Sequence, residues 1–336
     1  MIDTVHAFLS VGTVLRVRTK LCELLGIEHP VLNAPMAIVA GAQLAAAVSD
    51  SGGLGMIGGA LRSPDGLRSE LGVANGLSDR RIGVGFISHL PEANELTSVA
   101  LQCGVTIIAH SFADPTPFVA PIHDTGALLI CQVRTVAEAE RAAAAGADIV
   151  VAQGTEAGGH TGRISTLPLV PAVVDAVAPM PVIAAGGICD ARGMAAALML
   201  GADGVWMGTR FEATPEATVT PAFREQLVAA GTDDTLLTTT FDLALKQDWP
   251  EGIAMRVLRN RFTDAWHGRE NEVRAWRQEQ SDEYRTTGFF SRTEGATPAG
   301  ESVGVIKNVE PAGRIVERLM AETAALLRGR ASALLG

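Results

Sequence analysis

A glycine-rich stretch around one histidine contains the residue types best suited to chemistry. It reads Ile149-Val-Val-Ala-Gln-Gly-Thr-Glu-Ala-Gly-Gly-His-Thr-Gly-Arg163. The apolar start is typical of a buried strand, and the glycines after it predict a turn. His160 would then follow the carboxyl end of a strand, where α/β folds place their chemistry. Because glycine has no Cβ, such a turn lets the backbone approach a flat or phosphorylated ligand.

A simpler interpretation stays open for this stretch. A lone histidine in a loop is also suited to ordinary hydrogen bonding, and the glycines alone could mark a tight turn. The choice depends on the elements that position the stretch.

Composition limits the classes of protein to consider. The chain has 336 residues, of which 47% are hydrophobic, with 36 glycines, which is typical of a compact α/β protein with a sizeable core. A net charge of −10 and an aromatic content of 4% disfavour nucleic acid as a partner. The four cysteines contain no C-x-x-C pair, which favours reduced thiols in the cytoplasm and no metal site. We expect no membrane segment, and interpret residues 1–17 as an N-terminal extension.

Short apolar runs of strand length recur along the chain, separated by helical segments. A series of buried strands that each precede a helix predicts a parallel (β/α)₈ TIM barrel, and a doubly wound open sheet is the alternative. The open sheet is disfavoured because no G-x-G-x-x-G follows Met36. The predicted strands are 30–36, 53–58, 82–87, 106–110, 127–133, 148–153, 181–186 and 204–211, and the helices include 43–51, 91–102, 115–124, 136–145, 167–176 and 190–200.

The last two strand–turn units indicate a phosphate site. The strand that begins at Pro181 leads to a glycine pair and then to Asp190, a good N-cap for the next helix, whose first amides could bind an anion. The following strand ends with Gly208 and Thr209, which offer further amides and a hydroxyl. In barrels, the turns after the seventh and eighth strands commonly bind phosphate.

Five motifs in order resemble the nitronate monooxygenase family, formerly called 2-nitropropane dioxygenases, over residues 20 to 265. They are Asn33-Ala-Pro-Met36, Ala47-Val-Ser-Asp-Ser-Gly-Gly-Leu-Gly55, Ala152-Gln-Gly-Thr-Glu-Ala-Gly-Gly-His160, Ala184-Ala-Gly-Gly-Ile188 and Met207-Gly-Thr-Arg-Phe211. The resemblance implies an FMN cofactor and a catalytic role for His160. It also implies cofactor contacts from Ala34, Met36, Gln153, Gly158, Gly187, Trp206, Met207, Gly208 and Thr209.

Four positions leave questions that the sequence does not answer. Gly85 stands where family members often carry an asparagine that helps hold FMN. His110 could face the site or belong to the core. Cys189 could be a reactive thiol at a helix start or a buried small residue, and Glu156 could orient His160 or lie exposed.

The part after the barrel has a different character. We predict a barrel over 18–230, a helical and loop lid region over 231–305, and a C-terminal helix within 306–336 that packs on the barrel. Residues 255–260 and the charged stretch through Arg285 are interpreted as helices with solvated faces. Residues 288–304, rich in glycine, serine and threonine, are expected to form a loop, with a lid or a homodimer contact as options.

The expected reaction is oxidation of an alkyl nitronate by dioxygen to a carbonyl compound and nitrite. His160 would take the proton next to a nitro group or hydrogen-bond its oxygens. One alternative is an NAD(P)H-dependent FMN reductase of quinones or enoyl thioesters. Another is a flavin-binding barrel without catalysis, which His160 disfavours.

Overall fold

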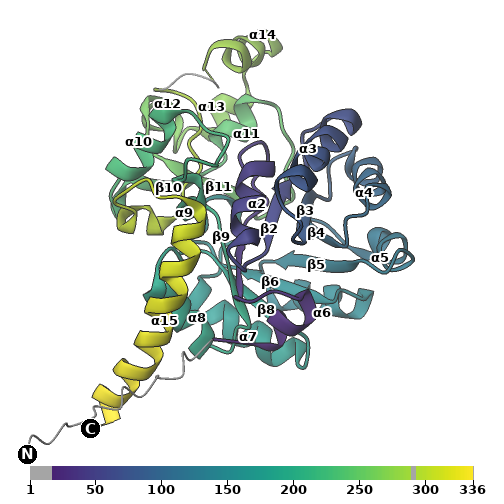
Figure 1. Ribbon diagram of the computed structural model, residues 1–336. Coiled ribbons are helices and arrows are strands. Elements are labelled where there is room, and N and C mark those ends of the chain that lie inside the picture. Colours follow the sequence, from purple (N-terminus) through teal and green to yellow (C-terminus); the bar gives the residue numbers. More distant parts are fainter. Residues whose placement is uncertain (1–16, 289–292, 336) are drawn as a thin grey trace, which may run out of the picture.

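The computed structural model describes residues 17–288 and 293–335. They form a barrel with helices around it and a second lobe beyond one end (Figure 1). The predicted (β/α)₈ barrel is confirmed. Residues 1–16 of the expected N-terminal extension lie outside the described residues, as do 289–292 of the expected loop.

Eight parallel strands form the barrel, in the order β1-β9-β8-β6-β5-β4-β3-β2. Each overlaps a run predicted from the sequence. Their bounds are β1 Val31–Asn33, β2 Gly55–Gly58, β3 Ile82–Ile87, β4 Ile107–Ser111, β5 Leu128–Val133, β6 Ile149–Gln153, β8 Val182–Ala185 and β9 Gly204–Met207.

Alternation along each strand divides the core into two layers. In β4, Ile107 and Ala109 belong to the cluster inside the barrel, whereas Ile108 packs in the outer layer beneath the helices. Helix α1 (Lys20–Leu25) contributes to the inner cluster through Leu21, which lies so close to β9 that a Cβ at Gly204 would be 2.5 Å from its Cδ2. The barrel is therefore a packed core, with its free rim at the other end.

The seam between β1 and β2 is closed by a side chain. Backbone pairing there is limited to an isolated bridge between Leu32 and Leu54. The fully buried Asn33 extends it, because its Nδ2 donates to the Met56 carbonyl at 2.8 Å and its Oδ1 accepts from the Met56 amide at 2.9 Å. The amide side chain thus replaces a missing strand contact at the buried joint.

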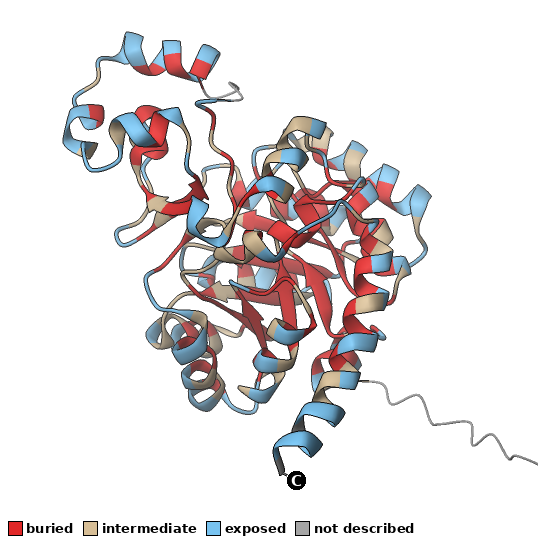
Figure 2. Cartoon of the chain, turned by 90° about the vertical axis from the view of Figure 1, so that its left-hand side faces the viewer, coloured by how far each residue is buried: buried red, intermediate tan, exposed pale blue. Residues whose placement is uncertain are grey.

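Helices cover the outside of the barrel with exposed outer faces (Figure 2). Some start at capping residues that the sequence supplies, such as Thr135, whose side chain accepts from the Glu138 amide. The helices are α2 Ala42–Asp50, α3 Pro64–Leu77, α4 Ala93–Gln102, α5 Thr116–His123, α6 Val136–Ala145, α7 Thr166–Val177 and α8 Ala191–Met199.

The last helix, α15 (Ala312–Leu335), lies within 306–336, the range in which a C-terminal helix was predicted. It contacts α2 and α8, and so fills the place between the first and last helices of the barrel layer (Figure 1). Ile315 and Val316 bury its inner face in the outer core layer. The eighth barrel strand and the helix that completes its unit are thus separated by an insertion.

We call this insertion, residues 213–311, the inserted lobe. It carries a three-stranded antiparallel sheet in the order β10-β11-β7, to which β7 (Gly159–Thr161) comes from the barrel part of the chain. Short α9 (Thr209–Glu212) leads into the lobe. The lobe's own elements are α10 Pro221–Ala229, η1 Thr232–Asp234, β10 Thr235–Thr238, α11 Thr240–Ala244, β11 Ala254–Leu258, α12 Arg261–Trp266, α13 Glu270–Arg274, α14 Gln278–Glu283, η2 Tyr284–Gly288 and η3 Glu301–Val305.

The helical interpretation of 255–260 is wrong, because Ala254–Leu258 form strand β11. The strand pairs on both sides and is central in its sheet. Arg256 in the strand and Arg259 just after it have helical spacing, but Arg256 is buried and bonded to the loop after β6. Tertiary pairing here overrides a local pattern of charge.

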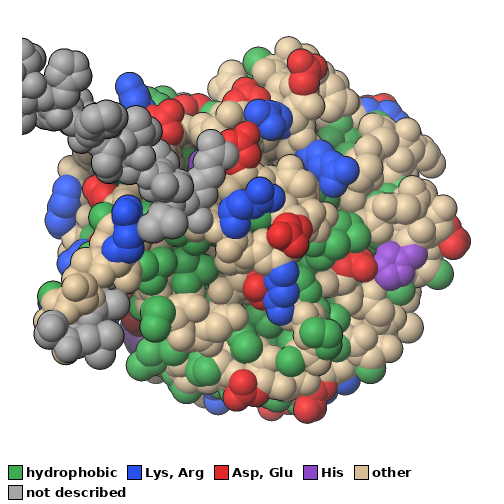
Figure 3. Space-filling model, turned by 60° about the horizontal axis from the view of Figure 1, so that its bottom comes forward, with side chains coloured by type: hydrophobic (Ala, Val, Ile, Leu, Met, Phe, Trp, Pro, Cys, Tyr) green, Lys and Arg blue, Asp and Glu red, His purple; other side chains and the backbone are tan. Residues whose placement is uncertain are grey.

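The surface carries charges of both signs. On the face in Figure 3, basic and acidic side chains are interspersed among apolar ones, without an extended basic patch. No helix within the described ranges combines the length and apolar character needed to cross a membrane.

Candidate active site at the barrel mouth

Inward-facing glutamines line the carboxyl ends of two neighbouring strands. Gln132 on β5 donates through Nε2 to Oε1 of Gln153 on β6 at 2.9 Å, and Gln153 donates to the carbonyl of His160 at 3.2 Å. Gln153 was expected at the site, whereas Gln132 was missed. Alternation within β5 could have indicated it, because it follows the interior residue Ile130 by two positions.

His160 lies on β7 rather than in an irregular glycine loop. Its backbone pairs opposite Met255 of β11, so the inserted lobe's sheet holds it beside the barrel mouth. Its Nε2 lies 2.9 Å from Oδ1 of Asp242, on α11 of the inserted lobe. Asp242 is 4% exposed, and its second oxygen is buried without a hydrogen-bond partner in the described part of the chain. Asp242 was not predicted from the sequence, because no local signal marks it.

An aromatic wall stands beside His160. Trp249, in the loop between α11 and β11, stacks on the imidazole with ring centroids 3.4 Å apart and planes 15° from parallel. His89 and Phe112, which follow β3 and β4, meet the indole edge-on at 4.6 and 5.2 Å. Burial lowers the pKa of His89, with His160 and Arg134 adding to the effect, so His89 is favoured in its neutral form. The wall therefore combines apolar faces with neutral polar edges.

Strained backbone occurs at the same rim. Phe112, directly after β4, has φ of 69°, and Ile38, in the loop after β1, has φ of 68°. A left-handed conformation is unfavourable for bulky side chains and persists where surrounding structure holds it. In Phe112 it accompanies contacts with Trp249 and with Arg134, whose guanidinium lies 5.8 Å from the ring centroid.

The loop after β1 crosses the mouth above a glycine. Ala34 and Met36, both predicted to contact the cofactor, are half-buried there. Between them, the Pro35 ring fills the space that a side chain at position 85 of β3 would need. A Cβ at Gly85 would lie 2.3 Å from the proline Cγ. Gly85, where the resemblance leads us to expect an asparagine, thus accommodates the Pro35 ring.

Three glycines form a cradle at the ends of β8 and β9, which we define as Gly186, Gly187 and Gly208. Gly186 and Gly187 have φ of 101° and 70°, values that favour glycine. Among the described residues, the amides of Gly187 and Gly208 have no hydrogen-bond acceptor. Gly187 is exposed and Gly208 half-buried, so both amides can be reached by an anion.

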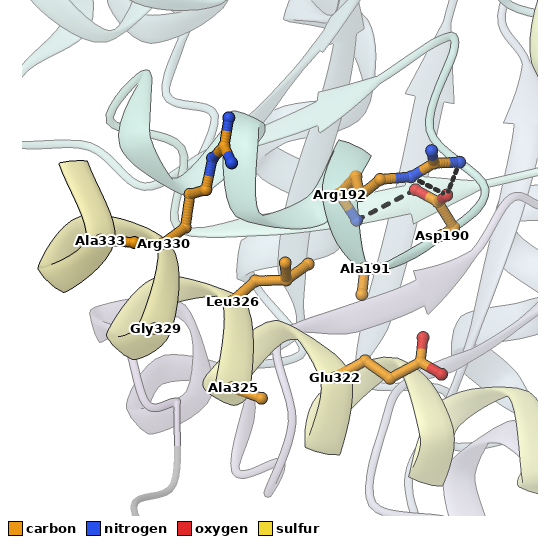
Figure 4. A pocket seen from close by; sticks show the side chains of 9 residues that line it. All are labelled: Asp190, Ala191, Arg192, Glu322, Ala325, Leu326, Gly329, Arg330 and Ala333. Carbon is orange, nitrogen blue, oxygen red and sulfur yellow. Dashed lines mark hydrogen bonds and ion pairs between the residues drawn. The ribbon is translucent and has the colours of Figure 1, made fainter.

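The start of α8 does not share this property. The predicted N-cap Asp190 is confirmed, but its Oδ1 accepts from the amides of Arg192 and Gly193, each at 3.0 Å. The expectation that these amides bind an anion is therefore wrong. Asp190 also pairs with the Arg192 side chain at the edge of a groove of about 570 Å³ between α8 and α15, where Leu326 is the large apolar side chain (Figure 4).

The inserted lobe packs against the glycine loop. A Cβ at Gly158 would lie 2.7 Å from the Gly300 amide nitrogen, so the two backbones are in direct contact. The same Gly300 amide donates to Thr209 Oγ1 at 2.9 Å, which leaves the threonine proton free to donate. Arg256 adds a bond from Nε to the Thr155 carbonyl and an ion pair with Glu301 at 3.0 Å.

Trp206 and Met207, both expected at the cofactor, point to opposite sides of β9. Trp206 belongs to the cluster inside the barrel and is 4% exposed. The Met207 side chain packs in the outer layer, so at the mouth it offers only its backbone, whose carbonyl accepts from the Ala34 amide.

The structure thus brings together at one rim Gln153, His160, Ala34, Met36, the glycine cradle and Thr209.

The questions about His110, Glu156 and Cys189 are answered by their contacts. His110 faces away from the site, between Ser88 and Thr97 and stacked on Phe118, and burial lowers its pKa to about 3. Glu156 accepts from the amide and hydroxyl of Thr166 at the start of α7, so it does not orient His160.

Cys189 is buried and donates to the Ser302 carbonyl. Burial, with a contribution from Asp190, raises its pKa to about 11, so Cys189 fits a buried small residue better than a reactive thiol.

Comparison with known proteins decides the family. A profile of nitronate monooxygenase matches residues 18–322. The chain belongs to the nitronate monooxygenase family. It is an oxidoreductase, as its relatives in this family and among dehydrogenases are. The resemblance found in the sequence motifs is therefore confirmed.

Two relatives illustrate the range of the family. Nitronate monooxygenase npaC of Metarhizium robertsii is 36% identical over 332 residues, which cover 88% of this chain and 91% of that protein. The (3aS,4S,5R,7aS)-5-hydroxy-7a-methyl-1-oxo-octahydro-1H-indene-4-carboxyl-CoA dehydrogenase of Mycobacterium tuberculosis is 39% identical over 252 residues, which cover 74% of this chain and 68% of that protein.

Solved structures show the same range. FabK from Thermotoga maritima superimposes with a TM-score of 0.86 at 35% identity, covering 94% of this chain and 99% of that one. Nitroalkane oxidase from Streptomyces ansochromogenes gives a TM-score of 0.77 at 30% identity, again covering 94% and 99%.

Proposed function

We propose that this protein binds FMN at the barrel mouth and oxidises alkyl nitronates with dioxygen to a carbonyl compound and nitrite. The observation that carries the proposal is the His160–Asp242 pair, 2.9 Å apart, at the same rim as the glycine cradle. A family relative named nitronate monooxygenase and a similar structure named nitroalkane oxidase support this substrate class.

The residues at the mouth fit a flat ligand with a phosphate. The free amides of Gly187 and Gly208, with the Thr209 hydroxyl, would hold the phosphate. The half-buried backbone of Ala34, Met36 and Gly158, with the Gln153 side chain, would contact the ring, above the buried Trp206. When bound, FMN would supply the redox chemistry, taking electrons from the substrate and passing them to dioxygen.

The protein's own part is to hold the substrate and its proton. His160 would hydrogen-bond the oxygens of a nitronate or take the proton from the carbon beside a nitro group. Trp249 and Phe112 would exclude water from this side of the barrel mouth. We assign the reaction to the cytoplasm, where the free thiols of all the cysteines would stay reduced.

A second candidate is oxidation or reduction of an acyl thioester, with NAD(P)H as electron donor in the reductive case. It is favoured by the relative named as a carboxyl-CoA dehydrogenase and by the similarity to FabK. His160 would serve this reaction as well, as a proton donor or acceptor next to the thioester carbonyl.

An anaerobic spectrum distinguishes the two candidates. The purified protein is loaded with FMN, and the visible absorbance is followed after addition of a nitronate and, separately, of NADH, NADPH or an acyl-CoA. Loss of absorbance with the nitronate, followed by nitrite release once oxygen is admitted, is the expected result. Loss only with a nicotinamide or an acyl-CoA would replace the first candidate by the second. Failure to bind FMN would refute both.

A further inference from the structure

We propose that Asp242 is the positioning residue of His160, and that it makes Nδ1 the atom that exchanges protons with the substrate. The inference deepens the proposed function and rests on it for the identity of the substrate. It assigns to the inserted lobe a direct part in catalysis.

The contact with Asp242 selects one tautomer of His160. A carboxylate accepts hydrogen bonds and does not donate, so the 2.9 Å contact requires the proton of a neutral His160 to lie on Nε2. Nδ1 then carries the lone pair. Among the described residues Nδ1 has no hydrogen-bond partner, so it is free to meet a substrate.

Asp242 lies in a buried environment. The side chain is 95% buried, and His160 is its hydrogen-bond partner in the described structure, while Oδ2 is buried and unpaired. A buried carboxylate with one partner is costly for folding. A role in catalysis accounts for this costly carboxylate, because Asp242 would form a full ion pair with the imidazolium that proton transfer creates on His160.

Packing and strand pairing hold both members of the pair in place. Phe241, next to Asp242, is fully buried in the lobe's core and stacks on Phe262 at 5.0 Å. His160 is held by strand pairing with Met255 and by Trp249 stacked on its ring. Asp242 therefore holds the Nε2 edge of the imidazole, and Trp249 holds one of its faces. These two contacts fix the orientation of the Nδ1 edge.

The proton transfer that follows is balanced. The C–H bond beside the nitro group breaks, its electron pair forms the C=N bond of the nitronate, and the nitro oxygens take up the negative charge. The proton forms the N–H bond at Nδ1, and the imidazolium stays paired with Asp242. A nitronate supplied ready-made needs no such step, so the role of Asp242 differs between the two substrate forms.

The kinetic test compares the neutral nitroalkane with its nitronate in Asp242→Asn. The amide can donate to Nε2 and so favours the opposite tautomer, with the proton on Nδ1. Turnover of the nitroalkane should fall on the order of 10²–10⁴-fold, the usual contribution of general acid–base catalysis. Turnover of the nitronate and the affinity for FMN should change little. An unchanged ratio of the two rates would overturn the proposal.

A spectroscopic test is independent of any substrate. In protein labelled with ¹⁵N-histidine, the ring nitrogens of His160, assigned by comparison with His160→Gln, should show the Nε2–H tautomer at mildly alkaline pH. Asp242→Asn should shift them toward Nδ1–H. If the wild type oxidises neither nitro compound, the proposed function fails, whereas this spectrum still decides the Asp242 assignment. The Nδ1–H tautomer in the wild type would refute it.

The chain contains a matched control. His123 and Asp148 form a second pair with the same 2.9 Å separation, where β6 begins and α5 ends, at the opposite end of the barrel. Asp148→Asn should leave both rates unchanged. If Asp242→Asn folds poorly, the double variant with His160→Gln gives the answer from rates per folded protein. If Asp242 acts through His160, the double variant should be no slower than His160→Gln alone. A further loss of rate in the double variant would contradict the proposal.

Discussion

Trp249 and His160 stack nearly parallel, with ring centroids 3.4 Å apart, although one belongs to the inserted lobe and the other to a strand between two barrel elements. The stack joins the lobe to the barrel at the point where the chemistry is proposed. His89 and Phe112 contact the same indole from two further barrel loops. Trp249 therefore links the lobe to three segments of the barrel part of the chain at the mouth.

Replacing Trp249 by alanine should weaken substrate binding. Aromatic pairs contribute about 0.5–1.5 kcal/mol beyond burial, which corresponds to a rise in KM of roughly two- to tenfold. Trp249→Phe should retain most of the affinity because a ring remains. Steady-state kinetics with nitronate measures the effect, and Trp266→Phe, in the lobe's own aromatic cluster, is the control. Equal kinetics in Trp249→Ala and wild type would show that the indole does not line the substrate site.

Replacing Gly187 by alanine should abolish tight FMN binding. The position has φ of 70°, and a Cβ would lie 3.3 Å from Glu156 Cβ, within the cradle. Gly126→Ala is a matched control, because its φ is 76° and a Cβ there meets nothing within 4 Å. Both variants should lose about 1–2 kcal/mol of stability from backbone strain. Flavin titration should separate them, and equal affinity in both would argue against a phosphate at Gly187.

Replacing Gly85 by asparagine should destabilise the protein. A Cβ there would lie 2.3 Å from Pro35 Cγ, and overpacking in a filled core typically costs about 1–3 kcal/mol. Pro35→Gly removes that ring, so the double variant should be more stable than the sum of the two single effects predicts. Urea unfolding of the four proteins measures the coupling. Strict additivity would mean that Pro35 does not fill this place.

Glu212→Gln should change how stability depends on pH. Burial raises the Glu212 pKa from 4.5 to about 8, so the folded state keeps a proton that the unfolded chain releases. This contribution is present below pH 4.5 and is lost as the pH rises through about 8. Glutamine at position 212 does not ionise, so the variant should be as stable as the wild type at low pH and more stable than it above pH 8. Unfolding curves across this range check it, and parallel pH profiles would contradict it.

Much of the architecture follows from local pattern. The apolar runs, their period and the capping residues predicted the barrel, its strands and its last helix, because burial of alternate side chains depends on near neighbours in the sequence. His160, Gln153 and the glycine cradle were found for the same reason, since each follows directly after a strand. The helical interpretation of 255–260 failed because pairing on both sides of β11 outweighs a charge pattern.

The sequence by itself determined which residues stand at the ends of the barrel strands. Tertiary structure alone decided what completes the site. Asp242 lies 82 residues from His160 and Trp249 still farther, and both reach the imidazole because β11 pairs with β7. Long-range strand pairing leaves no trace in the spacing of residues, so the partners of His160 become visible only in the folded chain.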